Sequence, residues 1–277
     1  MTKPRILLFD SGMGGLTVAS AVAKQMPDAH LIYSADNAGF PYGAWEEGKL
    51  TQRIVMVLGA LIAKTKPDVV VIACNTASTI AMAALRAAYE VPFVGTVPAI
   101  KPAAAQTKSG IIGVLATPGT VNREYTHSLI HTYAFHCKVF LHGAPRLAEI
   151  AEQKLRGHPV DLAELKDEVA PVFRKRDGSR TDVVVLGCTH YPLLTDEIAK
   201  VAPWPVIYID PSPAIARRVA DVAEETVLKG PDSSVPSPGT VILTSARGQG
   251  SETLAAYAAM GFPTLDVLDL PVGETTH

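Results

Sequence analysis

The sequence predicts an α/β protein of two similar units, each a mainly parallel β-sheet between layers of helices, in a three-layer arrangement. Short apolar runs alternate with longer, alanine-rich stretches along the whole chain, as when crossover helices join parallel strands. One sequence motif is also repeated: DVVVIACNTAS at 68–78 aligns with DVVVLGCTHYP at 182–192, so that Cys74 aligns with Cys188. The repeat of a strand with its following turn indicates two related halves.

The first unit contains short segments that are apolar on both faces, which is typical of buried parallel strands. We expect its strands at 5–10, 30–35, 69–73 and 92–95. The segments between them have the length and composition of helices, which we expect at 14–24, 45–66 and 79–89.

The second unit begins near Gly110 and follows the same alternation. We expect its strands at 111–116, 138–142 and 183–187, and its helices at 121–132, 146–155, 162–174 and 193–201. The first strands of the two units also correspond, because ILLFDSG and IIGVLATPG both end in small polar residues before glycine. Each unit therefore has a polar turn after its first strand and a cysteine turn after a later one.

The last part of the chain returns to strand–helix alternation. Ser212 is expected to cap a helix that has Pro213 at its first position and runs to about Leu228. Gly230 would stop that helix, and the proline- and serine-rich segment 231–239 would form a loop.

One more strand and helix are expected at 241–246 and 251–261. Because connections are usually short and right-handed, this tail should return to the first sheet. The predicted domains are therefore 1–97 together with 207–277, and 98–206.

Composition narrows the class of protein. Of the 277 residues, 48% are hydrophobic, so a sizeable core can form. The net charge of −2 gives no excess of positive charge with which to bind nucleic acid. No apolar run is long enough to span a bilayer, and the first residues, MTKPRILLFDSG, do not resemble a signal peptide. Three cysteines without CxxC spacing do not suggest a disulfide framework. We expect a cytoplasmic protein that binds neither nucleic acid nor membrane.

Cys74 and Cys188 each follow an apolar strand, where a helix is expected to begin. In open α/β sheets, ligands bind outside the carboxyl ends of the strands. A helix N-terminus favours a thiolate through its dipole and its backbone amides. The pairs Asn75-Thr76 and Thr189-His190 add polar side chains, so both turns suit a carboxylate substrate.

Other interpretations of the cysteines stay open at this point. A free cysteine at the end of a strand is commonly a packed core side chain, and Cys137, which has no counterpart in the repeat, is expected to be one. A zinc site would draw on the chain's cysteines and histidines, but no CxxC or HxxxH spacing favours it. A pyridoxal enzyme would need a Schiff-base lysine, and no lysine follows a strand in a polar turn.

Two further motifs have both a structural and a functional interpretation. DSGMGGLT at 10–17 lacks the spacing of known phosphate loops, so it is either a tight strand-to-helix turn or a turn whose Asp10 and Ser11 face a ligand. FPYG at 40–43 is either an ordinary turn or a loop that offers the Tyr42 hydroxyl and the Gly43 amide to a ligand.

The motifs taken together resemble those of the glutamate racemases, within the aspartate/glutamate racemase family. The resemblance follows the family's order from about residue 5 to residue 215 and is looser beyond. ACNTAST with LGCTHYPLL is its most specific pair. The segments that carry it are FDSGMGGLTV, YSADNAGFPYG, ACNTAST, GTVPAIKPA, GVLATPGTV and LGCTHYPLL.

The resemblance implies a racemase that uses no cofactor and no metal and supplies D-glutamate for peptidoglycan. It also implies two α/β domains related by a pseudo-two-fold axis, with the active site in the cleft between them. Inverting a tetrahedral carbon in this way calls for proton removal on one face and delivery on the other. Two thiols in two similar units would meet that need.

By motif match, Cys74 and Cys188 are the acid/base thiols, assisted by Asp10 and His190 respectively. The residues implied to hold the substrate are Asp10, Ser11, Tyr42, Gly43, Asn75, Thr76, Thr189 and His190. One segment departs from the family pattern CPxLVPLVE, because it reads APRLAEIAE at 144–152. Glu152 takes the position of the family's assisting glutamate, but Glu149 is close enough that the choice stays open.

Two alternatives to a glutamate racemase remain. An aspartate racemase or a related cofactor-independent racemase would keep the fold and the thiols and change the substrate. A two-domain protein that binds a small carboxylate without turnover would keep only the fold. A homodimer is compatible with the resemblance.

Overall fold

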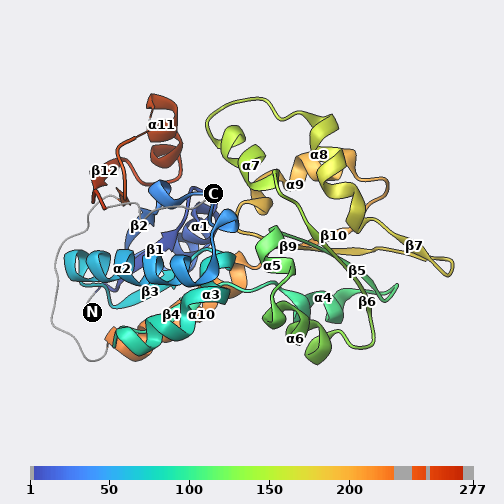
Figure 1. Ribbon diagram of the computed structural model, residues 1–277, viewed down its shortest axis with the longest axis horizontal. Helices are drawn as coiled ribbons and strands as arrows, with labels where there is room; N and C mark the ends of the chain where they lie inside the picture. Colours follow the sequence, from blue (N-terminus) through green and yellow to red (C-terminus); the bar gives the residue numbers. More distant parts are fainter. Residues whose placement is uncertain (1–2, 228–238, 248–249, 271–277) are drawn as a thin grey trace. The chain divides into compact units, whose positions relative to one another are not determined.

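The computed structural model describes residues 3–227, 239–247 and 250–270 of the chain (Figure 1). These residues form two compact units: one within 1–96 and 212–277, the other within 97–211. No helix among them is both long and apolar enough to cross a membrane.

The first unit contains a six-stranded sheet in the order β12-β11-β2-β1-β3-β4, in which every neighbouring pair is parallel. Its strands are β1 (Arg5–Asp10), β2 (His30–Ala35), β3 (Val69–Ile72), β4 (Phe93–Gly95), β11 (Thr240–Leu243) and β12 (Thr264–Val267). Its helices are α1 (Leu16–Gln25), α2 (Glu47–Thr65), α3 (Asn75–Ala88), α10 (Ser212–Val227) and α11 (Ser251–Ala259). Two 3₁₀ turns, η1 (Asn37–Gly39) and η2 (Tyr42–Ala44), lie between β2 and α2.

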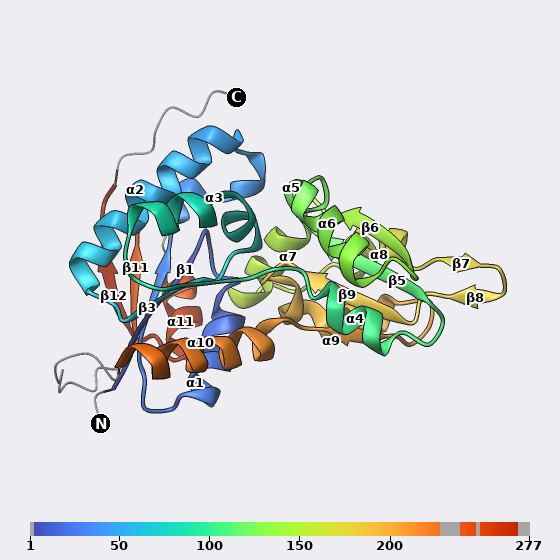
Figure 2. The ribbon, with the colours of Figure 1, turned by 90° about the horizontal axis from the view of Figure 1, so that it is seen from below.

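Helices cover both faces of this sheet. Figure 2 shows α2 and α3 on one face and α1 and α10 on the other. Leu7 and Phe9 of β1 pack in a fully buried cluster with Ile54 and Leu58 of α2. Because side chains alternate along a strand, Leu8 points to the opposite face, where it is also fully buried. Burial on both faces explains the continuous apolar strand sequences.

The second unit contains a four-stranded parallel sheet in the order β10-β9-β5-β6. Its strands are β5 (Ile111–Ala116), β6 (Lys138–Gly143), β9 (Val183–Gly187) and β10 (Ile207–Ile209), and a separate antiparallel hairpin is formed by β7 (Lys175–Arg176) and β8 (Ser179–Arg180). Its helices are α4 (Ile100–Gln106), α5 (Pro118–Val121), α6 (Glu124–Tyr133), α7 (Leu147–Leu155), α8 (Leu162–Val169) and α9 (Thr195–Val201). Two 3₁₀ turns are η3 (Ala170–Val172) and η4 (Tyr191–Leu194).

The second sheet also lies between two layers. Val183 and Val185 of β9 belong to the cluster that includes residues of α4 and α6. Val184 and Leu186, which alternate with them, belong to the cluster on α7, α8 and α9. In both units the strand that precedes the cysteine is the neighbour of the unit's first strand, β3 beside β1 and β9 beside β5.

The predicted α/β class with mainly parallel sheets is confirmed. The tail returns to the first sheet as predicted, because β11 pairs with β2. The boundary predicted at 207 is wrong: β10 pairs with β9, so the second unit continues to residue 211. The first boundary lies after residue 96, one residue before the predicted one. The predicted helix end at Leu228, the stop at Gly230 and almost all of the loop at 231–239 lie outside the described residues.

Several elements differ from the predictions for local reasons. The helix expected at 121–132 begins only at Glu124, as α6, because the short helix α5 ends at Val121. The helix expected at 162–174 ends at Val169, two residues before Pro171. The hairpin β7–β8 was not predicted, although Asp177-Gly178 is a strong turn signal. Both turn residues have positive φ, 53° and 77°, as a two-residue hairpin requires. Helix α4 and strand β12 were also not predicted.

Candidate active site

The first thiol lies at the carboxyl edge of the six-stranded sheet. Parallel pairing of β1 with β3 aligns Phe9 with Ile72. The residues that follow these strands, Asp10-Ser11 and Cys74, therefore emerge at the same edge of the sheet. All three are buried, with Cys74 7% exposed.

Ser11 links the aspartate to the thiol. Its Oγ lies 3.3 Å from Asp10 Oδ1 and 4.0 Å from Cys74 Sγ. The Asp10 carboxylate is in turn held by backbone amides, since Oδ1 accepts from Ser11 N at 2.6 Å and Oδ2 accepts from Gly15 N. The Tyr33 hydroxyl, which donates to the carbonyl of Gly12 at 2.8 Å, fixes the same turn. The aspartate is thus held rigidly, one hydroxyl away from Cys74.

Gly15 of DSGMGGLT has a packing function. A Cβ atom on Gly15 would lie 2.9 Å from both the Cβ and the carbonyl oxygen of Ala73, and 3.0 Å from the Cβ of Asp10. The turn after β1 can therefore approach the end of β3 only with glycine at this position. The tight strand-to-helix turn is therefore confirmed, and it brings Ser11 beside Cys74; that Asp10 and Ser11 face a ligand stays a prediction.

Cys74 is the N-cap residue of the 14-residue helix α3. The positive end of the helix dipole and the first backbone amides of α3 lie at the thiol, where they favour a negative charge. Asn75 and Thr76, the first two residues of the helix, are buried beside it, at 2% and 6% exposure. The helix begins four residues earlier than predicted, directly after the cysteine.

The second thiol lies at the carboxyl end of β9, beside a histidine and a glutamate. Cys188 Sγ is 3.7 Å from His190 Nδ1, and His190 Nε2 is 3.2 Å from Glu152 Oε1. All three side chains are buried, as is Thr189. A carboxylate at Nε2 favours a proton on that nitrogen, so Nδ1 is presented to the thiol.

Glu152, rather than Glu149, contacts the histidine. Glu152 lies on the buried face of α7 with Leu147 and Ile150, at 3% exposure, whereas Glu149 is exposed. This is the position that the family pattern assigns to the assisting glutamate.

The surroundings of the two cysteines differ. After Cys188 the chain forms a turn and the 3₁₀ segment η4, and α9 begins at Thr195, two residues after the predicted start of the helix at 193–201. Cys74 has a helix N-terminus and a serine hydroxyl next to it, whereas Cys188 has a buried imidazole and carboxylate. The two thiols therefore occupy the same position in their sheets, but different groups stabilise the negative charge on each sulfur.

The loop after β2 is held by a buried ion pair that the sequence motifs do not predict. The Asp36 carboxylate, fully buried, accepts from Arg53 Nε at 2.7 Å and from Arg53 Nη2 at 2.5 Å. The Tyr42 hydroxyl donates to Asp36 at 2.5 Å and the Thr244 hydroxyl at 2.6 Å. Burial, and next the charge of Asp36, raise the pKa of Tyr42 well above its usual value, so this hydroxyl stays a donor.

These contacts give Tyr42 of FPYG a structural role, and its contact with a ligand stays a prediction. The Tyr42 hydroxyl, predicted as a ligand contact, gives its hydrogen to Asp36 and so anchors the loop. Gly43 beside it is exposed, and a Cβ atom there would meet nothing within 4 Å. The sequence signal for the network was an arginine on the apolar stripe of α2, between Leu50 and Ile54.

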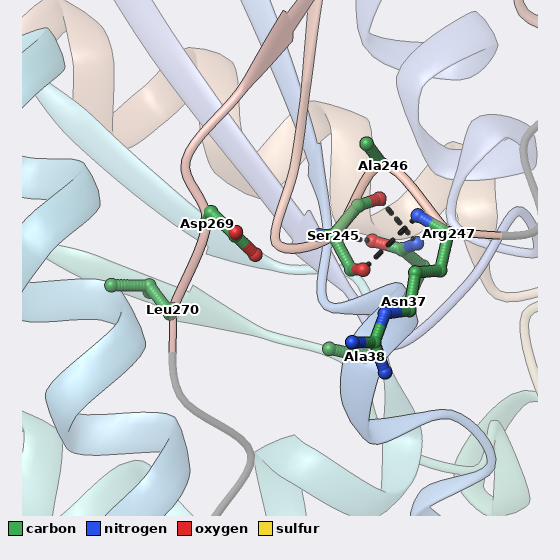
Figure 3. Close-up of a pocket in the computed structure, with 7 residues that line it drawn as sticks. All are labelled: Asn37, Ala38, Ser245, Ala246, Arg247, Asp269 and Leu270. Atoms are coloured by element: carbon green, nitrogen blue, oxygen red, sulfur yellow. Dashed lines mark hydrogen bonds between the residues drawn. The ribbon is translucent and has the colours of Figure 1, made fainter.

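A cavity of about 580 Å³ lies at the ends of β2, β11 and β12 (Figure 3). Arg247 and Asp269 are the charged residues that line it. The Asn37 side chain donates to the carbonyl of Ser245 at 2.8 Å and accepts from its amide at 3.1 Å, which joins two of the walls. None of the residues that line the cavity belongs to the two cysteine turns.

The third thiol is set apart from the other two. Cys137, just before β6, is half-buried and packs at the edge of the cluster that includes Ile112 and Val114. Burial raises the pKa of its thiol, so it is protonated at neutral pH. Within the described ranges, no three or more His, Cys, Asp or Glu side chains are grouped as metal ligands.

The chain is similar in sequence and in structure to known proteins. Residues 16–219 match the family described as Asp/Glu/Hydantoin racemase. Over 218 residues, 78% of each chain, the sequence is 56% identical to the glutamate racemase of Brucella anthropi.

Solved structures show the same similarity over nearly the whole chain. The glutamate racemase of Escherichia coli, solved with L-glutamate and the activator UDP-MurNAc-Ala, is 40% identical with a TM-score of 0.89, covering 96% of this chain and 98% of that one. The glutamate racemase isoform RacE1 of Bacillus anthracis is 29% identical with a TM-score of 0.81, covering 99% of this chain and 100% of that one.

Proposed function

The chain belongs to the Asp/Glu/hydantoin racemase family, and on this premise we propose that it interconverts L- and D-glutamate by proton transfer with two cysteine thiols. The identity of 56% to curated glutamate racemases supports the choice of glutamate over aspartate. The observation that carries the mechanism is the pair of buried thiols, each at the carboxyl end of a strand and each supported by its own polar partner.

In the proposed reaction both thiols act on one α-carbon from opposite faces. One cysteine, as thiolate, takes the α-proton, and the electron pair of the C–H bond stays on the carbon. The other cysteine, as thiol, then gives its proton to the opposite face. One proton leaves and one arrives, so the product is the mirror image and the two sulfurs have exchanged protonation states. The reverse reaction uses the same groups in exchanged roles.

The two thiols need different help in this step. Asp10 acts on Cys74 through the Ser11 hydroxyl, whose oxygen is within 3.3 Å of the carboxylate and 4.0 Å of the sulfur. His190 acts on Cys188 directly, and Glu152 keeps the imidazole oriented. Glu152 is therefore added to the assisting residues, and Glu149 is not.

Substrate binding is assigned to the polar groups around the two turns. Because the α-proton of an amino acid is far less acidic than a thiol, the pocket has to stabilise charge that develops at the reacting centre. Preorganised amides and hydroxyls provide that stabilisation, as at the N-terminus of α3. The proposed set is Asp10, Ser11, Gly43, Asn75, Thr76, Thr189 and His190, with Tyr42 contributing through the loop that it anchors.

The proposed biological role is to supply D-glutamate for peptidoglycan synthesis in the cytoplasm, without a cofactor or a metal. No nucleic-acid or membrane partner is part of the proposal. Sedimentation of the purified protein would test the homodimer that is compatible with the family resemblance.

The function is tested by circular dichroism of D-glutamate incubated with the purified protein, freed of metal and pyridoxal phosphate. The signal of the amino acid should decay to zero, because the two enantiomers have equal free energy. A parallel incubation with D-aspartate should lose its signal much more slowly. An unchanged D-glutamate signal would favour the non-enzymatic binding protein, and faster loss of the D-aspartate signal would favour the aspartate racemase.

A further inference from the structure

Arg156 lies directly behind the histidine of the second cysteine turn. It follows the last residue of α7, one helical turn after Glu152, and its Nη2 is 2.7 Å from Glu152 Oε2. The glutamate side chain is 4% exposed and that of the arginine 31% exposed. The ion pair is therefore partly shielded from water on the side of the carboxylate.

The two carboxylate oxygens of Glu152 contact different residues. Oε1 lies 3.2 Å from His190 Nε2, and Oε2 is held by the guanidinium. A buried carboxylate is costly unless it is paired, and an uncompensated one rotates toward another donor or takes up a proton. A protonated or rotated Glu152 would no longer fix the proton on His190 Nε2, so Nδ1 would not be presented reliably to Cys188.

We propose that Arg156 is a positioning residue for the Cys188 half of the racemisation. It keeps Glu152 ionised and oriented, and Glu152 in turn orients His190 toward the sulfur at 3.7 Å. This inference rests on the proposed two-thiol function. It assigns to Arg156 an effect on one of the two proton transfers and none on the Cys74 half.

The chain offers a matched control on the same helix. Lys154 also lies in the last turn of α7 and is 34% exposed, and it pairs with Glu197 at 2.7 Å. That pair does not include the glutamate that contacts His190. Arg156→Gln and Lys154→Gln therefore remove one cation each from the same helix end, where a cation also interacts favourably with the helix dipole.

Arg156→Gln should lower kcat about tenfold with little change in KM, because it removes the cation that holds the carboxylate bonded to the His190 imidazole. Arg156→Lys, which keeps the charge but not the forked geometry, should recover most of the loss. Lys154→Gln should stay within about twofold of the unmodified enzyme. Because the equilibrium constant of a racemisation is one, kcat/KM has to fall equally in both directions.

The decisive readout is the kinetic isotope effect with α-deuterated D- and L-glutamate, measured separately. Slowing the Cys188 step should raise the effect for the enantiomer whose α-proton Cys188 removes. It should lower the effect for the other enantiomer, because delivery of a solvent-derived proton by Cys188 then limits the rate. Lys154→Gln should change neither value, since a general loss of stability does not separate the two half-reactions.

If Arg156→Gln showed the same isotope effect as Lys154→Gln for each enantiomer, this inference would be overturned and the proposed function would stay intact. No turnover of glutamate by the unmodified protein would overturn the function itself, and the inference with it. If Arg156→Gln does not fold, the same comparison is made with Arg156→Lys, for which smaller changes of the same opposite signs are expected.

Discussion

Replacing either Cys74 or Cys188 with alanine is expected to abolish racemisation, with turnover at least about a thousandfold lower. Each substitution removes the only group proposed to exchange a proton on one face of the α-carbon. Alanine offers no proton, and the remaining thiol can only return a proton to the face from which it came. Circular dichroism of D-glutamate with each purified variant measures the loss, and the far-ultraviolet spectrum of the protein shows whether the variant is folded.

Cys137→Ala is the matched control for these variants. Its thiol is half-buried and packs at the edge of a core cluster, so alanine should change stability slightly and leave most of the turnover. Two outcomes would contradict the assignment: near-normal racemisation by folded Cys74→Ala or Cys188→Ala, or complete loss in folded Cys137→Ala.

The second large effect is expected on stability, from the ion pair between Asp36 and Arg53. Both side chains are buried, at 0% and 5% exposure. Arg53→Met leaves the carboxylate of Asp36 buried without its cation, which should lower the free energy of unfolding by about 3–5 kcal/mol. Tyr42→Phe removes one hydrogen bond to the same carboxylate and should cost about 1.5–3 kcal/mol, less than Arg53→Met.

Urea unfolding of these variants tests that order against an exposed ion pair from the same helix. Lys64 of α2 lies 3.0 Å from Asp266 of β12, with both side chains more than 40% exposed. Lys64→Met should cost less than about 1 kcal/mol, because exposed pairs contribute little. If Arg53→Met were no more destabilising than Lys64→Met, Asp36 would not be held by a buried charge pair. Tyr42→Phe should retain turnover, since its hydroxyl serves the loop.

Much of the fold could be predicted because its strands are short, apolar on both faces and followed by polar turns. The runs at 5–10 and 183–187 become β1 and β9 with the predicted bounds. Helix boundaries were less predictable, since 3₁₀ turns and prolines divide segments that have a uniform composition, such as 162–174. The short strand at Ile207–Ile209 is partly exposed, and only its pairing with β9 shows to which unit it belongs.

The candidate site was predictable where a motif carries it and not where partners come from distant segments. Cys188 and His190 are two residues apart, so their proximity follows from local sequence. Glu152 lies 38 residues before His190, and only the phase of α7, which buries Glu152 and exposes Glu149, separates the two acids. Asp36 and Thr244 are 208 residues apart and meet because β11 pairs beside β2. Such contacts depend on sheet order, which a single sequence does not specify.

The proposed mechanism uses two bases, rather than one, to move the proton. In a two-base reaction the thiol that removes the α-proton is not the thiol that delivers one. The delivering thiol has exchanged with solvent, so its proton comes from water. A single base that moves from one face to the other would instead return the proton that it removed.

Racemisation in heavy water, followed early in the reaction by proton NMR of the α position, distinguishes these two cases. Starting from D-glutamate, the L product should carry deuterium at its α-carbon, while the remaining D-glutamate stays mostly protiated. Starting from L-glutamate, the same pattern should hold with the thiols in exchanged roles. Early product that is largely protiated, in either direction, would contradict the two-thiol mechanism.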